Sequence, residues 1–182
     1  PLENEAYGKI ISQKHYNRIC SLIDDKKVVF GGEREPQSQR IAPTVMDGVT
    51  RRDAVMGEEI FGPLLPVLTY DDDEALIADI NSQPHPLAFY VFSSDKAFVE
   101  KLTTRCPFGG GCVNDTIIHL ATSHMGFGGV GMSGMGSYHG KDGFDCFTHN
   151  KSIMSKSTMF DLPVRYQPYT KKKEKLLRGV LK

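Results

Sequence analysis

Two adjacent carboxylates stand beside an aromatic residue in the stretch Glu58-Glu59-Ile60-Phe61-Gly62-Pro63. A carboxylate accepts hydrogen bonds from a diol, and an aromatic ring offers a flat apolar face. Glu59 could therefore bind the hydroxyls of a sugar, and Phe61 could stack on a planar ring. The spacing alone favours a simpler scaffold role, in which a helical turn ends in two solvated acids and Phe61 lies in the core.

A second stretch, residues 126–143, contains eight glycines. Gly129, Gly131 and Gly134 match the G-x-G-x-x-G spacing of a dinucleotide-binding loop, which also needs a strand before it and an acid about twenty residues later. Residues 123–127 do not form an apolar strand pattern, and no acid stands near position 154. The stretch is therefore interpreted as a tight irregular loop that borders a pocket.

Asn114 and three histidines follow the apolar run that ends at Val113. Ligands bind beyond the carboxyl ends of strands in parallel sheets, and histidine is a frequent general acid or base. His119, His124 and His139 are thus candidates for proton transfer. The simpler interpretation is an ordinary surface or hydrogen-bonded histidine in each case, and a turn or cap residue for Asn114.

The composition is that of a globular chain of 182 residues, with 40% hydrophobic and 24% charged residues. Its 22 basic and 22 acidic residues cancel, which argues against a nucleic-acid partner. Six of the basic residues and one acid fall in 171–182, so this tail carries a net charge of +5 and the remainder −5. No apolar run is long enough for a membrane helix. Four cysteines show no zinc-ligand spacing and are expected to be reduced thiols of a cytoplasmic protein: Cys20, Cys106, Cys112 and Cys146.

Alternating strands and helices would position these residues. An apolar helical face at 16–23 follows Ser12 as the N-cap. Further helices are expected after the acids at 71–74 and after the cap at 93–95. The remaining expected elements are strands at 27–30, 41–45, 64–70, 87–92 and from Cys112, and a helical turn within 53–59. The alternation from about 65 to 113 predicts βαβ units, hence an α/β protein with a parallel sheet whose strands are buried.

The chain resembles the C-terminal half of an aldehyde dehydrogenase in three stretches: Glu58-Glu59-Ile60-Phe61-Gly62-Pro63, Asn114-Asp115, and Phe127 to Gly136 with the sequence FGGVGMSGMG. The continuation Ser137-Tyr138-His139-Gly140-Lys141 is similar to the class 3 branch, which includes the fatty and aromatic aldehyde enzymes. The likeness covers essentially the whole chain in matching order. It implies the C-terminal part of the parallel-sheet catalytic domain of the aldehyde dehydrogenase fold.

The resemblance also implies roles for particular side chains. Glu59 corresponds to the glutamate that hydrogen-bonds the nicotinamide-ribose hydroxyls of NAD or NADP, and Phe61 to the aromatic beside the nicotinamide. The wall of the aldehyde pocket is matched by four residues: Ile117, Leu120, Phe127 and His139. The segment from Phe147 to Ile153 corresponds to a strand that crosses a dimer interface, so a homodimer is implied.

In this family a cysteine thiolate attacks the aldehyde, and a glutamate-activated water hydrolyses the resulting thioester. That cysteine, in a Gly-Gln-x-Cys motif, and that glutamate are expected upstream of Pro1, so the 182-residue chain alone is expected to be inactive. Cys20 and Cys112 are interpreted as core residues. The expected organisation is a C-terminal portion of the catalytic domain at 1–146, an oligomerisation strand at 147–157 and a C-terminal tail at 158–182.

Two alternatives remain open. The chain could be a non-catalytic truncated homologue that acts as a dimerisation or assembly module. The basic tail is interpreted as a solvated terminal helix, and the leucines among its lysines leave a weak contact of 171–182 with a membrane surface as the alternative. The preferred aldehyde, and the choice of NAD or NADP, depend largely on residues outside this chain.

Overall fold

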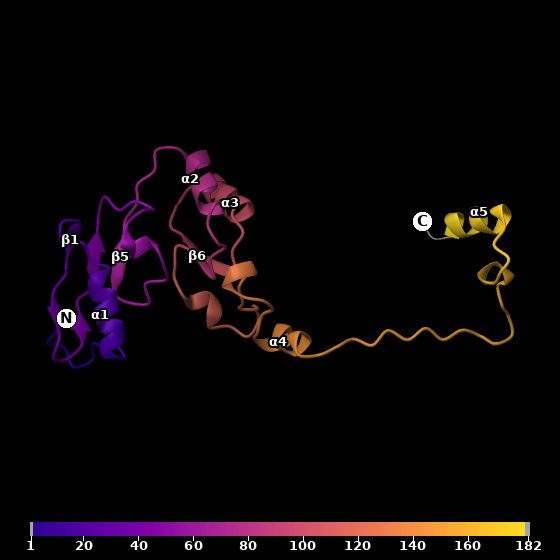
Figure 1. The fold of residues 1–182 in the computed structure, drawn as a ribbon, viewed down its shortest axis with the longest axis horizontal. Helices are drawn as coiled ribbons and strands as arrows, with labels where there is room; N and C mark the ends of the chain where they lie inside the picture. Colours follow the sequence, from indigo (N-terminus) through magenta and orange to yellow (C-terminus); the bar gives the residue numbers. More distant parts are fainter. Residues whose placement is uncertain (1, 181–182) are drawn as a thin grey trace.

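The first lobe, residues 2–70, is organised around the helix α1 (Gln13–Ser21) (Figure 1). In the computed structural model, which describes residues 2–180, the Ser12 hydroxyl accepts a hydrogen bond from His15 N and caps this helix, as predicted. Tyr16 and Ile19 of the expected apolar face are buried, and Ile19 is 0% exposed. They form one core with Leu22, Ile23, Ile41, Met46, Val49, Val55 and Leu64.

Three strands form the sheet of the first lobe, in the order β1 (Val28–Phe30), β4 (Thr44–Met46) and β5 (Leu64–Pro66). β1 runs antiparallel to β4, and β5 runs parallel to it. The strand expected at 41–45 is divided, because Ile41 belongs to a separate hairpin of β2 (Arg34–Glu35) and β3 (Arg40–Ile41). Pro43 lies at the break, where it has no backbone N–H to donate to a ladder.

A short 3-10 helix, η1 (Ala54–Met56), leads toward the acidic motif and lies within the helical turn expected at 53–59. Asp53 anchors its start. The Asp53 carboxylate accepts hydrogen bonds from Lys27 Nζ at 2.7 Å and from the backbone N and hydroxyl of Thr50 at 2.6 Å and 2.9 Å. The hydrogen bond from Lys27 and those from Thr50 lower the pKa of Asp53 to about 2. The carboxylate is therefore ionised at neutral pH and holds the entry to the motif against the start of β1.

The second lobe, residues 71–146, begins with α2 (Asp73–Asn81), β6 (Ala88–Val91), α3 (Lys96–Arg105) and β7 (Gly110–Val113). Both helices have acidic caps where acids were expected: Asp72 accepts a hydrogen bond from Ala75 N at 2.8 Å, and Asp95 accepts one from Ala97 N at 2.9 Å. β6 and β7 are parallel partners, so β6-α3-β7 is one of the predicted βαβ units. Its core consists of Ile77, Val91, Leu102 and Cys106.

The single parallel sheet predicted across 65–113 is wrong in one respect. β5 lies in the sheet of the first lobe, whereas β6 and β7 form a separate two-stranded sheet. All three residues of β5 pair with β4, and the strand ends at Pro66, so residues 67–70 are not in a strand. The predicted strands are also less buried than expected, since Leu65 in β5 is 61% exposed. β6 ends at Val91, one residue before Phe92, which is 65% exposed. The class remains α/β, with parallel pairing in both lobes.

Beyond β7 the chain forms η2 (Ile118–Leu120), η3 (Gly131–Ser133) and α4 (Gly140–Cys146). It then leaves the second lobe as an extended segment, residues 147–162, here called the arm (Figure 1). The arm leads to η4 (Pro163–Arg165) and α5 (Lys171–Val180), so the described part of the basic tail is helical and residues 181–182 lie outside the described chain. Over the described residues, none of the helices has the length and apolar character needed to span a bilayer.

Candidate cofactor and aldehyde site

The two acids of the motif at 58–63 differ in their surroundings. Glu58 Oε1 accepts a hydrogen bond from Arg18 Nη1 on α1 at 2.8 Å. The Glu59 side chain is exposed, and within residues 2–180 no hydrogen bond or ion pair engages its carboxylate. Glu59 is thus the acid that is free to accept hydrogen bonds from a diol, and it is the one that the family resemblance assigns to that task.

Phe61 is presented to solvent, so the alternative of a core phenylalanine is wrong. Phe61 is 81% exposed and has a φ of +49°, in the left-handed region that bulky residues seldom adopt. The next residue presses against α1, where a Cβ on Gly62 would lie 2.7 Å from Ile19 Cδ1. The chain is therefore held against the core immediately after Phe61, while the ring itself stays available for stacking.

The four expected wall residues lie in two segments of the second lobe that meet. Ile117 and Leu120 form one turn, in which Leu120 N donates to Ile117 O at 2.9 Å. The rings of Phe127 and His139 are stacked with centroids 6.5 Å apart. His119 connects the two segments, because it lies in the same turn as Leu120 and its ring centroid is 5.7 Å from that of Phe127.

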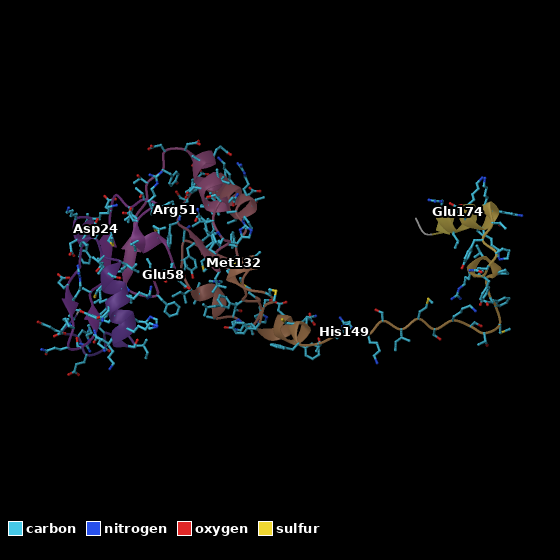
Figure 2. The ribbon with its side chains drawn as sticks, viewed as in Figure 1. Asp24, Arg51, Glu58, Met132, His149 and Glu174 are labelled. Atoms are coloured by element: carbon cyan, nitrogen blue, oxygen red, sulfur yellow. The ribbon has the colours of Figure 1, made fainter. Side chains whose placement is uncertain are left out.

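The cofactor pair and the wall residues lie on different lobes. Glu59 and Phe61 belong to the first lobe by sequence, and the Gly-rich loop belongs to the second. Figure 2 labels Glu58 in the first lobe and Met132 in the second. The structure therefore assembles each half of the predicted site separately. Among the described residues, no hydrogen bond or ion pair joins Glu59 or Phe61 to a wall residue.

The Gly-rich stretch is a closed loop beside a cavity, as interpreted from the sequence. Phe127 and Tyr138 pair at its base, with each backbone N donating to the other residue's carbonyl at 2.9 Å and 3.0 Å. No strand lies directly before Gly129, and the element that begins at Gly131 is the three-residue η3. The geometry of a dinucleotide-binding loop is therefore absent at this stretch. A cavity of about 320 Å³ borders the loop, lined by Leu87, Phe127, Met135, Tyr138, Cys146, Phe147 and five small residues.

Replacing Gly128 by alanine is expected to destabilise this loop, because a Cβ there would overlap the carbonyl oxygen of Gly136. Overpacking of this kind costs about 1–3 kcal/mol. Gly8→Ala is the matched control, since nothing lies within 4 Å of a Cβ at Gly8. Thermal unfolding should show a lower midpoint for the first variant only. Equal midpoints for the two variants would contradict the close approach across the loop.

His119 has a larger structural role than its sequence context indicates. It is 6% exposed, its Nδ1 lies 3.5 Å from Cys112 Sγ, and its ring packs against those of Tyr90 and Phe127. Of the simpler interpretation, a surface or hydrogen-bonded histidine, the hydrogen-bonded form is confirmed for His119 and the surface form is wrong. Its position between Ile118 and Leu120 was the available signal for burial. Its Nε2 has no partner within the described chain.

Asn114 and the cysteines have structural roles. Asn114 Oδ1 accepts from Ser93 N at 2.8 Å and its Nδ2 donates to Ser93 O at 3.0 Å, which joins the ends of β6 and β7 and confirms the simpler interpretation.

All four cysteines are free. Burial raises the pKa of Cys106, which makes it a poor nucleophile. Cys20 and Cys112 are half-buried at the edge of the packed regions rather than within them. Over residues 2–180, no three His, Cys, Asp or Glu side chains are grouped to hold a metal.

Comparison with known proteins gives the class to which this fold and site belong. A model described as the aldehyde dehydrogenase family matches residues 1–153. The chain belongs to the aldehyde dehydrogenase family. Since the match extends from the first residue through α4 into the arm, it includes both halves of the candidate site.

Three curated relatives are similar over most or all of the chain. The 4,4'-diaponeurosporen-aldehyde dehydrogenase of Staphylococcus aureus is 46% identical over 99% of this chain and 39% of its own length. Aldehyde dehydrogenase family 3 member H1 of Arabidopsis thaliana is 42% identical over 100% of this chain and 38% of its own length. The rat protein named aldehyde dehydrogenase, dimeric NADP-preferring, is 41% identical over 86% of this chain and 35% of its own length. The chain therefore spans less than two fifths of the length of these relatives.

A solved structure confirms the fold. The substrate-bound state of Staphylococcus aureus AldH superposes with a TM-score of 0.85 at 45% identity, over 100% of this chain and 40% of that one. The lobes described here are therefore those of an aldehyde dehydrogenase. The separate sheets of the first and second lobes account for only part of the neighbour's chain.

Proposed function

We propose that this chain is the C-terminal part of a class 3-like aldehyde dehydrogenase, which uses NAD or NADP to oxidise an aldehyde to a carboxylic acid. The observation that carries the proposal is the free carboxylate of Glu59 next to the exposed ring of Phe61, in a member of this family. The 182-residue chain supplies the nicotinamide side of the cofactor site. It also supplies part of the wall of the aldehyde pocket.

The residues of the motif fit the nicotinamide riboside. The Glu59 carboxylate accepts hydrogen bonds from the two ribose hydroxyls, and a charged acceptor makes these bonds about twice as strong as a neutral one does. Phe61 offers its exposed face to the nicotinamide ring. The bound nicotinamide supplies the acceptor for the hydride that the aldehyde carbon loses. The motif thus holds the reactive ring in place.

The wall residues favour an apolar substrate. Ile117 is 61% exposed and stands beside Leu120, and Phe127 stacks on His139, so three of the four are hydrocarbon surfaces. Such walls suit a medium- or long-chain or an aromatic aldehyde. One relative is named 4,4'-diaponeurosporen-aldehyde dehydrogenase.

None of the four cysteines is placed as the nucleophile. Cys106 is 2% exposed, and Cys20 and Cys112 are half-buried in contacts within their own lobes. Cys146 is exposed at the end of α4, outside any Gly-Gln-x-Cys sequence. In this proposal, the thiolate that forms the thiohemiacetal and the thioester comes from another part of the whole enzyme, and the glutamate that activates water is assigned there as well.

The arm supports a homodimer. Phe147, Ile153 and Met154 are 81–89% exposed on a segment that forms no strand within its own chain. An extended segment with exposed apolar side chains and unpaired backbone groups can add as a strand to a neighbouring sheet edge. A partner's sheet is the proposed acceptor for 147–157. The rat relative carries the word dimeric in its name.

The described part of the tail forms a basic helix with an apolar groove. A cavity of about 900 Å³ lies between η4 and α5, where Leu162, Val164 and Leu176 are flanked by Lys172, Lys173 and Lys175. A solvated helix remains the proposal for this tail. The weak membrane-surface contact stays the alternative, because apolar residues ringed by lysines are also what an anionic lipid surface attracts.

Absorbance at 340 nm tests the proposed function. A full-length enzyme that contains this chain is mixed with NAD⁺ or NADP⁺ and with either decanal, benzaldehyde or acetaldehyde. Reduction of the cofactor is expected, with a higher kcat/KM for decanal or benzaldehyde than for acetaldehyde. Absence of turnover with all three aldehydes would favour the non-catalytic assembly module. A preference for acetaldehyde would refute the apolar pocket.

A further inference from the structure

Arg18 links α1 to the acidic motif across 40 or more residues of sequence. Its Nη2 donates to the carbonyl oxygen of Ile60 at 2.6 Å. Its Nη1 donates to Glu58 Oε1 at 2.8 Å and approaches the carbonyl oxygen of Glu59 at 3.5 Å. One guanidinium therefore meets three consecutive residues of the motif, two of them through the backbone.

The backbone contacts matter because of what surrounds them. The Ile60 side chain packs against the core of the first lobe, and Gly62 lies against Ile19. Phe61, between them, has a positive φ that an isolated phenylalanine would avoid. Arg18 fixes the carbonyl immediately before Phe61, so the ring is directed outward from a backbone that is held on both sides.

The ion pair between Arg18 and Glu58 affects the second functional residue, Glu59. Two adjacent carboxylates repel each other, and both would compete for any nearby cation or hydroxyl. The Arg18 guanidinium engages Glu58, whose side chain is 55% exposed, and neutralises its charge locally. The Glu59 carboxylate is left without a partner among the described residues. The guanidinium thereby decides which acid of the pair is available.

We propose that Arg18 is a positioning residue of the cofactor site, which holds Glu59 and Phe61 in their binding geometry without contacting the cofactor. The inference rests on the proposed function, because it takes the nicotinamide riboside as the ligand of these two side chains. It adds a residue of α1 to the site. The planar guanidinium suits this task, since it presents two nitrogens in a rigid fork to neighbouring acceptors.

The test measures initial rates of the full-length enzyme with varied NAD⁺ or NADP⁺ for Arg18→Gln, Arg18→Lys and Glu58→Gln. Arg18→Gln is expected to raise the cofactor KM about tenfold, the effect of losing hydrogen bonds from a charged donor. The aldehyde KM should stay within about twofold. Arg18→Lys should recover part of the loss, since an ammonium can still donate to the Ile60 carbonyl. Glu58→Gln keeps the backbone contacts and should change the cofactor KM less than about threefold.

Arg34→Gln is the matched control. Arg34 lies in the same lobe, pairs with Asp25, and its Nε donates to the carbonyl oxygen of Gly32 at 3.2 Å. Its side chain is 28% exposed, against 24% for Arg18, and it has no contact with the motif. An unchanged cofactor KM in Arg34→Gln, together with the rise in Arg18→Gln, supports the proposal.

Three outcomes would overturn it. An unchanged cofactor KM in Arg18→Gln, with an active wild-type enzyme, removes the positioning role alone. An equal rise in Arg34→Gln shows a general loss of stability, which thermal unfolding of both variants would reveal. If Arg18→Gln fails to fold, Arg18→Lys provides the test. A wild-type cofactor KM and an unchanged kcat in Arg18→Lys would show that the two-nitrogen fork of the guanidinium is not needed. A wild-type enzyme that reduces no cofactor refutes the proposed function itself, a result distinct from the first.

Discussion

Glu59→Gln in the full-length enzyme is expected to lower kcat/KM for the nicotinamide cofactor by about 10- to 100-fold, which corresponds to hydrogen bonds to a charged group worth about 1.5–3 kcal/mol. The amide keeps one acceptor oxygen but loses the charge, and its NH₂ faces hydroxyls that need an acceptor. The size of the effect follows from the free state of this carboxylate, which has no partner within residues 2–180 to share its hydrogen-bonding capacity.

The neighbouring acid provides a matched control for this prediction. Glu58→Gln makes the same chemical change one residue away, but Glu58 is engaged by Arg18 at 2.8 Å. Its effect on kcat/KM for the cofactor should therefore stay below about threefold. Initial rates at varied cofactor and saturating aldehyde measure both. Equal losses in the two variants would mean that net charge, rather than the Glu59 carboxylate, controls cofactor binding.

If the full-length enzyme is the proposed homodimer, introducing aspartate at both Phe147 and Ile153 is expected to convert it into monomers. The two side chains are 89% and 81% exposed in the single chain. Burying each in a partner contributes about 1.5–3 kcal/mol. An unpaired carboxylate buried in their place costs several kcal/mol more. Sedimentation or light scattering at micromolar concentration measures the mass.

Met159→Asp is the control for the arm. Met159 is 82% exposed on the same extended segment, but it lies beyond the predicted oligomerisation strand at 147–157. This variant should remain a dimer. A wild-type enzyme that is already monomeric, or a Phe147/Ile153 double variant that stays dimeric, would contradict the role proposed for the arm.

Local features of the fold were predictable from the sequence because they depend on neighbours within four residues. Ser12 and Asp95 cap helices through hydrogen bonds to backbone N–H groups two or three positions ahead. The apolar face at Tyr16 and Ile19 follows from helical periodicity. The choice of partner for β5 was not predictable in this way, because strand pairing is non-local, and β5 pairs with β4 rather than with β6.

The candidate site was predictable only in part. Residue types and family resemblance identify Glu59 and Phe61, but the exposure of the ring depends on how Gly62 and Ile60 pack against the core. Arg18 carries no sequence signal, because its partners are 40 to 42 residues away. The tilted packing of the His119 ring against Phe127 likewise depends on how the η2 turn meets the Gly-rich loop.

In the proposed function, this chain holds the nicotinamide side of an aldehyde dehydrogenase site and depends on a nucleophile elsewhere in the enzyme. Formation of NADH or NADPH at 340 nm, with decanal as substrate, tests it when the isolated 182-residue chain and the full-length enzyme are assayed side by side. Turnover is predicted for the full-length enzyme and none for the isolated chain. Turnover by the isolated chain, at a rate that survives purification to homogeneity, would contradict the account.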